Sequence, residues 1–422
     1  MKAIARRLVA EILWHQVRAL RKHNDFKVVA VAGSVGKTSA KLAIARVLAQ
    51  KYKVQYQDGN YNDLVTVPLI FFGANQPSLF NPFAWLHTFA SNAKKIRQEY
   101  PYDIVVVEVG TDYPGNLAEF KRYLSAEVGV IAGIAPEHME LFKSLDSVAH
   151  EELTLADFSS LVIVNKDLSA AKYIKGKDFL TYSLSGNGDF GLTNVMFSNN
   201  GASFDFIASG QKIMSANHQA ISEPQLYFAL AALAVGLKLG LSTAELKAGL
   251  DQIKPAPGRM QTLEGINGSK IIDDTYNASP EAVKAALQTL YRMKAPQKIA
   301  LLGNMNELGE YSRQAHQEVG EMCDPKKVDL IVTLGPDANE VLAPAAAQKG
   351  CKVQSFDSPF EAGDFIRSQI KAGALVLVKG SQNKVFAEEA VKKILADPTD
   401  AAKLVRQSDE WMKAKNQMFA QS

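Results

Sequence analysis

The stretch Lys27-Val-Val-Ala-Val-Ala-Gly-Ser-Val-Gly-Lys-Thr38 decides the fold of this chain. Its first six residues are apolar and mostly β-branched after Lys27, and they predict a short buried strand. The residues from Ala40 to Tyr52 have the spacing of a helix. A strand, a glycine-containing turn and a helix in this order indicate the first unit of an α/β fold with a largely parallel sheet.

The turn itself has the residues of a phosphate-binding loop. In such a loop backbone N–H groups approach phosphate oxygens, the lysine (Lys37) reaches the terminal phosphates, and the hydroxyl of Thr38 ligates Mg²⁺. The full pattern has a further glycine where this chain has Val31, so the loop is a variant, and a fortuitous Gly-Lys-Thr turn is the alternative. We expect a nucleoside triphosphate and Mg²⁺ at Gly33, Ser34, Val35, Gly36, Lys37, Thr38 and Ser39.

Further strand-like runs follow in the central part of the chain. They lie at Asp103–Val109, Val128–Ile134 and Leu161–Asn165, and the segments between them are long enough for crossover helices. Between Leu180 and Met214 the pattern changes to short alternating segments, which predicts an antiparallel β insert. These features define a central domain over residues 26–256.

A second domain follows the linker Lys254-Pro-Ala-Pro-Gly258, which cannot continue a helix. Strands and helices alternate beyond it, and they predict a smaller, Rossmann-like doubly wound unit over residues 257–397. Residues 398–422 are expected to form a surface helix or a frayed tail. The fold class is therefore α/β, with a phosphate-loop ATPase domain and a smaller second domain.

The N-terminal residues 1–25 predict an amphipathic helix. Docking on the body of the domain is the favoured interpretation, and an anionic membrane surface is the alternative. A later aromatic segment between Phe71 and Pro101 predicts a helical hairpin over the core, or a replacement for substrate contacts. The residues expected on the apolar face of the first helix are Ile4, Leu8, Ile12, Leu13, Val17 and Leu20.

Composition excludes several classes of protein. The chain has 422 residues, a net charge of +3 and 47% hydrophobic residues, so it needs no nucleic acid partner. Two cysteines cannot build a disulfide framework and fit a reducing cytoplasm. The longest apolar run, 226–237, is too short to span a bilayer, so no stable membrane insertion is expected. We expect a cytoplasmic monomer.

Taken together with further motifs, the loop resembles that of the Mur ligase family, and most closely of its members that join D-alanyl-D-alanine to a UDP-muramyl tripeptide. The motifs occur in the family's order over most of the chain. They are Gly59–Asp63 with Pro68, Val106–Gly110 with Gly115, His138–Phe142, Pro257–Arg259, Asp273–Asn277 with Pro280, Leu302–Gly309 with His316, and Lys379–Ser381.

This resemblance implies an ATP-dependent amide ligase that acts through an acyl phosphate, with ATP, a UDP-muramyl peptide and D-alanyl-D-alanine as partners. Thr38 and Glu108 would hold one metal ion and His138 a second. Without the resemblance, Glu108 would be a solvated carboxylate at a strand end and His138 an ordinary loop histidine. Family members carry a carbamylated lysine where this chain has Glu152, so Glu152 is expected to supply that anionic oxygen. The alternative is a surface glutamate.

The remaining site residues follow from the same resemblance. Arg259 would bind the phosphates and Asp274 the ribose. Near adenine the family has two amide side chains; this chain has an amide, Gln225, at one of these positions and Phe228 at the other. The residues expected on the substrate side are Asn60, Asn62, Tyr276, Asn277, Lys379 and Ser381.

Some features depart from the family. Asp63, Thr66, Asn304 and Gln382 replace the usual residues, and only about 25 residues precede the loop strand, so the family's UDP-binding domain is expected to be absent. These departures leave two other functions open: a ligase for a different carboxylate acceptor, and a catalytically weakened nucleotide-binding scaffold.

Overall fold

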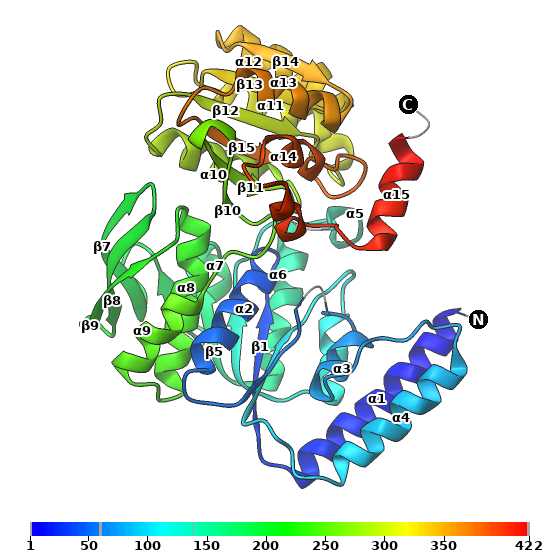
Figure 1. The fold of residues 1–422 in the computed structure, drawn as a ribbon. Helices are drawn as coiled ribbons and strands as arrows, with labels where there is room; N and C mark the ends of the chain where they lie inside the picture. The colour runs from blue at the N-terminus through cyan, green and yellow to red at the C-terminus, as the bar shows by residue number, and fades with distance from the viewer. Residues whose placement is uncertain (1, 59–60, 137, 420–422) are drawn as a thin grey trace. The chain divides into compact units, whose positions relative to one another are not determined.

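The computed structural model describes residues 2–58, 61–136 and 138–419. The chain separates into two compact units, Met1–Lys254 and Pro255–Ser422. Each unit has its own sheet with helices packed on it (Figure 1). The expected α/β class is confirmed in both.

The first unit is built on a nine-stranded sheet in the order β2-β3-β1-β4-β5-β6-β7-β8-β9. The strands from β2 to β6 are parallel, and β7, β8 and β9 add an antiparallel meander at one edge. The mostly parallel sheet and the antiparallel insert are thus as predicted. The bounds are β1 Lys27–Ala32, β2 Val54–Gln55, β3 Ile104–Glu108, β4 Ala126–Ile131, β5 Ser159–Asn165, β6 Leu180–Ser183, β7 Phe190–Ser198, β8 Gly201–Ala208 and β9 Gln211–His218.

Helices cover both faces of this sheet, which is why β1 is apolar at nearly every position. Val29 and Val31 face the core under α2, α8 and α9, whereas Val28 and Ala30 face the core under α1, α3 and α4. The helices of this unit are α1 Lys2–His23, α2 Lys37–Leu48, α3 Thr66–Phe71, α4 Pro82–Ile96, α5 Met139–Phe142, α6 Leu145–Leu153, α7 Ala171–Ile174, α8 Glu223–Lys238 and α9 Thr243–Gln252.

The first helix docks on the body as expected, but the predicted apolar face was wrong in part. Leu13, Trp14, Val17 and Leu20 are buried, while the large apolar side chains of the first three turns are exposed. Those turns extend beyond the body, where α4 accompanies α1 (Figure 1). The predicted hairpin between Phe71 and Pro101 is also wrong, because the segment forms the single helix α4, which pairs with α1.

The second unit has a six-stranded sheet in the order β10-β11-β15-β12-β13-β14, all parallel except β10. Helices α13 and α14 share one core with alternate strand residues, which leaves α10 and α11 to cover the opposite face. The bounds are β10 Gln261–Glu264, β11 Lys270–Asp274, β12 Lys298–Gly303, β13 Leu330–Leu334, β14 Val353–Phe356, β15 Leu375–Lys379, α10 Pro280–Arg292, α11 Ser312–Met322, α12 Ala343–Gln348, α13 Pro359–Gln369, α14 Glu388–Ile394 and α15 Asp409–Phe419.

Candidate active site

The phosphate loop lies where β1 ends and α2 begins, and its backbone requires glycine at two positions. Gly33 and Gly36 have φ angles of +125° and +80°, which side chains rarely allow. A Cβ atom at Gly33 would lie 2.9 Å from the carbonyl oxygen of Gly133, and one at Gly36 would lie 2.6 Å from the ring of Phe228. The loop therefore opens directly onto the N-terminus of α2, which is the geometry that binds phosphate.

Glu152 fixes the start of this loop. Its Oε2 atom accepts a hydrogen bond of 2.7 Å from the backbone N–H of Gly33, and its side chain, on α6, is 1% exposed. It is therefore not the surface glutamate of the alternative interpretation. In the same loop the hydroxyl of Ser34 is buried and has no hydrogen-bond partner among the described residues, so a phosphate oxygen would satisfy it.

A buried ion pair lies beside the loop. Glu108 ends β3 opposite Val31 of β1, and its Oε2 atom is 3.5 Å from the ammonium nitrogen of Lys41 on α2. Asn62 donates a hydrogen bond of 3.4 Å to the other oxygen of Glu108. Burial lowers the pKa of Lys41, and the charge of Glu108 opposes that shift. Sequence analysis missed Lys41, although a lysine within the apolar helix run after the loop was a usable signal.

The other predicted residues of the first unit have mixed placements. His138 precedes α5 with a left-handed φ of 47°, and its Nε2 atom is 3.8 Å from Asp112. The side-chain oxygen of Gln225 accepts the N–H of Ile221 at 2.8 Å, so it supports the start of α8. Asn60 lies outside the described residues.

The donor atoms around the loop fit Mg²⁺ in part. Mg²⁺ prefers one or two carboxylates, with water and substrate phosphates as its other ligands. Glu108 is buried; its Oε2 atom makes no hydrogen bond within the described part of the chain and has the Lys41 ammonium 3.5 Å away. Within that same part, no three His, Cys, Asp or Glu side chains gather as a metal site. The structure thus offers carboxylate ligands for a Mg²⁺ ion that binds together with the nucleotide phosphates, and not a complete set of protein ligands.

In the second unit, the loop before β10 and the end of β11 lie against each other. The guanidinium carbon of Arg259 is 4.0 Å from the ring centre of Tyr276, within the range of a cation–π contact. The backbone N–H of Tyr276 donates to the carbonyl of Gly258 at 3.0 Å, and that of Met260 donates to Asp274 at 3.1 Å.

Lys379 joins this group from the neighbouring strand. Asp274 and Lys379 are register partners at the carboxyl ends of β11 and β15, and their side chains form a 2.5 Å ion pair. Lys379 also donates to the carbonyl of Asn277 at 3.0 Å, and the hydroxyl of Ser381 donates to that of Ala278 at 3.2 Å. The structure therefore brings all six residues predicted for this unit to one edge of its sheet.

Asp273 lies under the same loops and is fully buried. Its two oxygens accept hydrogen bonds from the N–H groups of Gly258 and Thr275 and from the Thr275 hydroxyl. Burial raises its pKa to about 6, although the Thr275 bonds oppose the shift.

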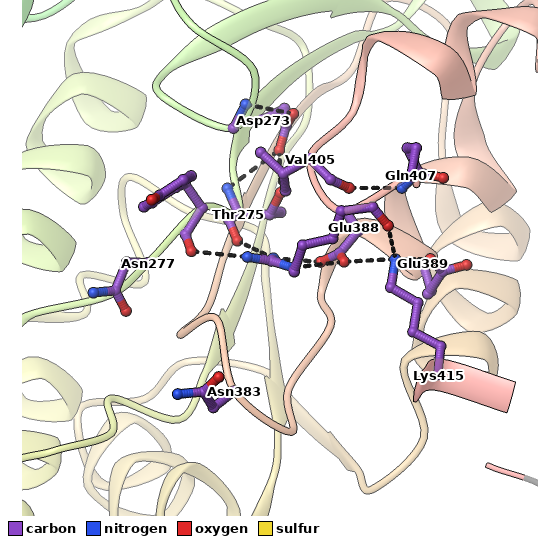
Figure 2. Close-up of polar contacts among 12 residues, drawn as sticks. Asp273, Thr275, Asn277, Asn383, Glu388, Glu389, Val405, Gln407 and Lys415 are labelled. Atoms are coloured by element: carbon purple, nitrogen blue, oxygen red, sulfur yellow. Dashed lines mark hydrogen bonds and ion pairs between the residues drawn. The ribbon is translucent and has the colours of Figure 1, made fainter. Parts of the chain in front are cut away.

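A segment outside the predicted site holds these loops in place. We call residues 398–419, which include α15, the C-terminal strap. Arg406 forms a two-point ion pair with Glu388 at 2.8 and 2.6 Å and donates to the carbonyls of Thr275 and Tyr276 at 2.6 and 3.0 Å. Lys415, 2% exposed, contacts Glu388 at 2.8 Å and Glu389 at 2.6 Å (Figure 2). Of the two alternatives expected for residues 398–422, a surface helix and a frayed tail, the structure shows the helix, α15, and buried charges anchor it.

Phosphate loop, parallel sheet and second doubly wound unit together define a phosphate-loop α/β protein of the nucleotide-binding class. The Mur ligase middle domain matches residues 31–236, and the Mur ligase glutamate ligase domain matches residues 258–382. The two matches cover most of the chain. The chain belongs to the Mur ligase family.

Individual relatives agree with this assignment. The UDP-N-acetylmuramoyl-tripeptide–D-alanyl-D-alanine ligase of Escherichia coli is 26% identical over 76% of this chain and 67% of its own length. That of Haemophilus influenzae is 27% identical over 90% of this chain and 78% of its own length. The crystal structure of MurF ligase from Thermotoga maritima in complex with ADP has the same fold, with a TM-score of 0.74 at 24% identity over 91% of this chain and 83% of its own.

Proposed function

We propose that this Mur ligase joins D-alanyl-D-alanine to a UDP-muramyl tripeptide at the expense of ATP, which makes it an ADP-forming acid–D-amino-acid ligase. The ligases of E. coli and H. influenzae that it resembles carry this activity in their names. The observation that carries the proposal is the phosphate loop with the buried Glu108–Lys41 pair at its edge.

The proposed reaction has two steps. The tripeptide carboxylate attacks the γ-phosphorus of ATP, the bond to the β-phosphate oxygen breaks, and ADP leaves. The amine of D-alanyl-D-alanine then attacks the acyl phosphate carbon, phosphate leaves with the bonding pair, and the amine loses a proton. In the first step two anions must meet, so Lys37 and the N-terminus of α2 have to stabilise the charge on the transferred group.

In this proposal Thr38 and Glu108 would hold one Mg²⁺ ion and His138 a second, and Glu152 would supply an anionic oxygen for the metals. When bound, the ions would supply positive charge against the phosphate oxygens. The hydrogen bond between Glu152 and Gly33 ties that carboxylate to the loop, so its position and the phosphate position are set together.

Further binding residues are proposed in both units. Arg259 and Asp274 would bind the nucleotide, and Tyr276, Asn277, Lys379 and Ser381 would bind the amine substrate. Asn60 and Asn62 are proposed as substrate residues of the first unit. Residues 26–256 would act as the ATP-binding domain and residues 257–397 as the second ligase domain. Two free, buried cysteines fit a reducing compartment, where we place the reaction.

The test is phosphate release and product mass with ATP, UDP-muramyl tripeptide and D-alanyl-D-alanine, with each omitted in turn. We expect product only when all three are present, and loss of product in Lys37→Ala but not in Lys53→Ala, an exposed control in the same unit. Failure to form product with any acceptor would favour the scaffold function.

A second candidate is a ligase for a different carboxylate acceptor. It is favoured by Asp63, Thr66, Asn304 and Gln382, which stand where the family usually has other residues. Product formed with another carboxylate, and none with the muramyl tripeptide, would establish this candidate in place of the first.

Glu152 is proposed to replace the carbamylated lysine of the family. Wild-type activity should then be independent of bicarbonate, whereas Glu152→Gln, which keeps an oxygen for the Gly33 N–H, should lose most of its activity without unfolding. Strict dependence of the wild type on bicarbonate, or a fully active Glu152→Gln protein, would reject this role.

A further inference from the structure

The helix pair formed by α1 and α4 exposes an unusual amount of apolar surface. Exposed fractions reach 67% for Ile4 and 57% for Leu8 on α1, and 80% for Phe80, 81% for Phe83 and 63% for Leu86 at the start of α4. Single exposed apolar residues are common, but a group of this size on two adjacent elements indicates a binding surface.

The exposed stripes of both helices change from apolar to basic residues along their length. On α1 the stripe begins with Ile4, Leu8 and Ile12 and ends with Arg18 and Lys22. On α4 the corresponding stripe begins with Phe83 and Leu86 and ends with Lys94 and Arg97. The two helices lie side by side with their N-terminal ends together (Figure 1), so the apolar halves adjoin each other and the basic halves do too.

Charge is concentrated in the same elements. Residues 2–23 and 80–97 contain nine basic residues and one acid, a net charge of +8. Since the chain as a whole carries +3, the remainder carries −5. Several of these cations pair with the body, as Arg6 does with Asp63 at 3.0 Å, but Arg18, Lys22, Lys94 and Arg97 are exposed.

A hollow on the flank of α1 adds a place for an anion. It encloses about 230 Å³ and is lined by Glu11, Trp14, His15, Arg18 and Arg122. Two arginines and a histidine line this hollow beside Glu11; Arg18 contacts His15 at 2.9 Å and Arg122 pairs with Glu119 at 3.6 Å. Guanidinium groups are suited to binding a lipid phosphate.

We propose that the helix pair is a docking surface for an anionic lipid bilayer. The apolar halves would enter the headgroup region while the basic halves contact lipid phosphates, as interfacial amphipathic helices do. A second copy of the chain fits the face poorly, because two surfaces of net charge +8 would repel. Among the described residues, no helix is both long and apolar enough to cross a membrane. The proposal is independent of the reaction.

Sedimentation of the full chain with vesicles tests this proposal. We expect binding to equimolar phosphatidylcholine and phosphatidylglycerol, little binding to phosphatidylcholine alone, and weakening by salt. The double variant Arg18→Gln/Lys94→Gln should lower the partition coefficient on the order of 30-fold, at about one fivefold step per cation. Phe83→Ser/Leu86→Ser should lower it on the order of tenfold.

Matched controls are Lys175→Gln and Met196→Ser, which remove an exposed cation and a 68% exposed apolar side chain elsewhere in the same unit. They should bind vesicles as the wild type does, and circular dichroism should show all variants folded. The proposal would be overturned if the wild type did not bind anionic vesicles, or if the control variants lost as much binding as the test variants. It would also be overturned if the protein did not bind vesicles but self-associated, and Phe83→Ser abolished that self-association.

Discussion

At the scale of single residues, the site depends on charges that are buried in pairs. Lys41 and Glu108 are 0% and 2% exposed at their side chains, and neither would be tolerated alone in the core. The pair lies where the phosphate loop meets β3, so it holds a carboxylate in place beside the loop at the cost of desolvating both groups.

Removal of Lys41 should therefore destabilise the protein strongly. In Lys41→Met the Glu108 carboxylate keeps its burial but loses the cation 3.5 Å away, so we expect the free energy of unfolding to fall by about 3 kcal/mol or more. Urea denaturation measures this. Lys41→Met/Glu108→Gln should recover much of the loss, and the exposed control Lys53→Met should show none; a double variant as unstable as the single one would contradict the pairing.

Asp273 makes folding sensitive to pH. Burial raises its pKa from 3.8 to about 6 in the folded protein. The folded state therefore binds more protons than the unfolded state between these values, and the free energy of unfolding falls as pH rises through that window. Compared with Asp273→Asn, which cannot titrate, the wild type should lose about 2 kcal/mol between about pH 4 and about pH 7. Parallel curves for the two proteins would contradict the assignment.

At the scale of elements, the C-terminal strap and the loops at the edge of the second sheet are one structure. Arg406 donates to the backbone carbonyls of Thr275 and Tyr276 and also binds Glu388. The strap therefore sets the position of this turn, and the ring of Tyr276 in it contacts Arg259. The side chain of Val405 also lies at Gly258, where an added Cβ atom would be 2.9 Å from it.

Arg406→Met should loosen the strap and the turn together. Glu388 would keep Lys415 but lose its two-point partner, so we expect the unfolding midpoint to fall and amide hydrogens of Thr275, Tyr276 and α15 to exchange faster. Arg406→Lys should restore only part of the protection, because an ammonium cannot make both contacts at once. The control Arg313→Met, exposed on α11, should leave exchange unchanged. Unchanged exchange in Arg406→Met would separate the strap from the site.

Sequence analysis found the elements better than it found their contacts. The strand predicted at Asp103–Val109 is observed at Ile104–Glu108, because apolar runs between turn residues identify buried strands. The strap was missed since the partner of Arg406, Glu388, is eighteen positions away and no local pattern signals that pairing. The side chains of Ile4, Leu8 and Ile12 were predicted to be buried but are exposed, because periodicity identifies an apolar stripe and not whether another element covers it.

At the scale of the whole molecule, each of the two units carries its own group of the residues proposed for function. The phosphate loop with Glu108 and Glu152 belongs to the first unit, and the cluster around Asp274 and Lys379 belongs to the second. Motif order brought attention to both groups because strand ends and the loops after them are local in sequence. Asn60 stays a prediction, since it lies outside the described residues.

The most direct test of the central claim follows one oxygen atom. The tripeptide acceptor is prepared with heavy oxygen in its terminal carboxylate and incubated with the protein, ATP and D-alanyl-D-alanine, and the released phosphate is analysed by mass spectrometry. An acyl phosphate intermediate predicts one heavy oxygen in each phosphate, together with an amide product of the expected mass. Amide product accompanied by unlabelled phosphate would contradict the mechanism, and absence of the product would contradict the proposed function.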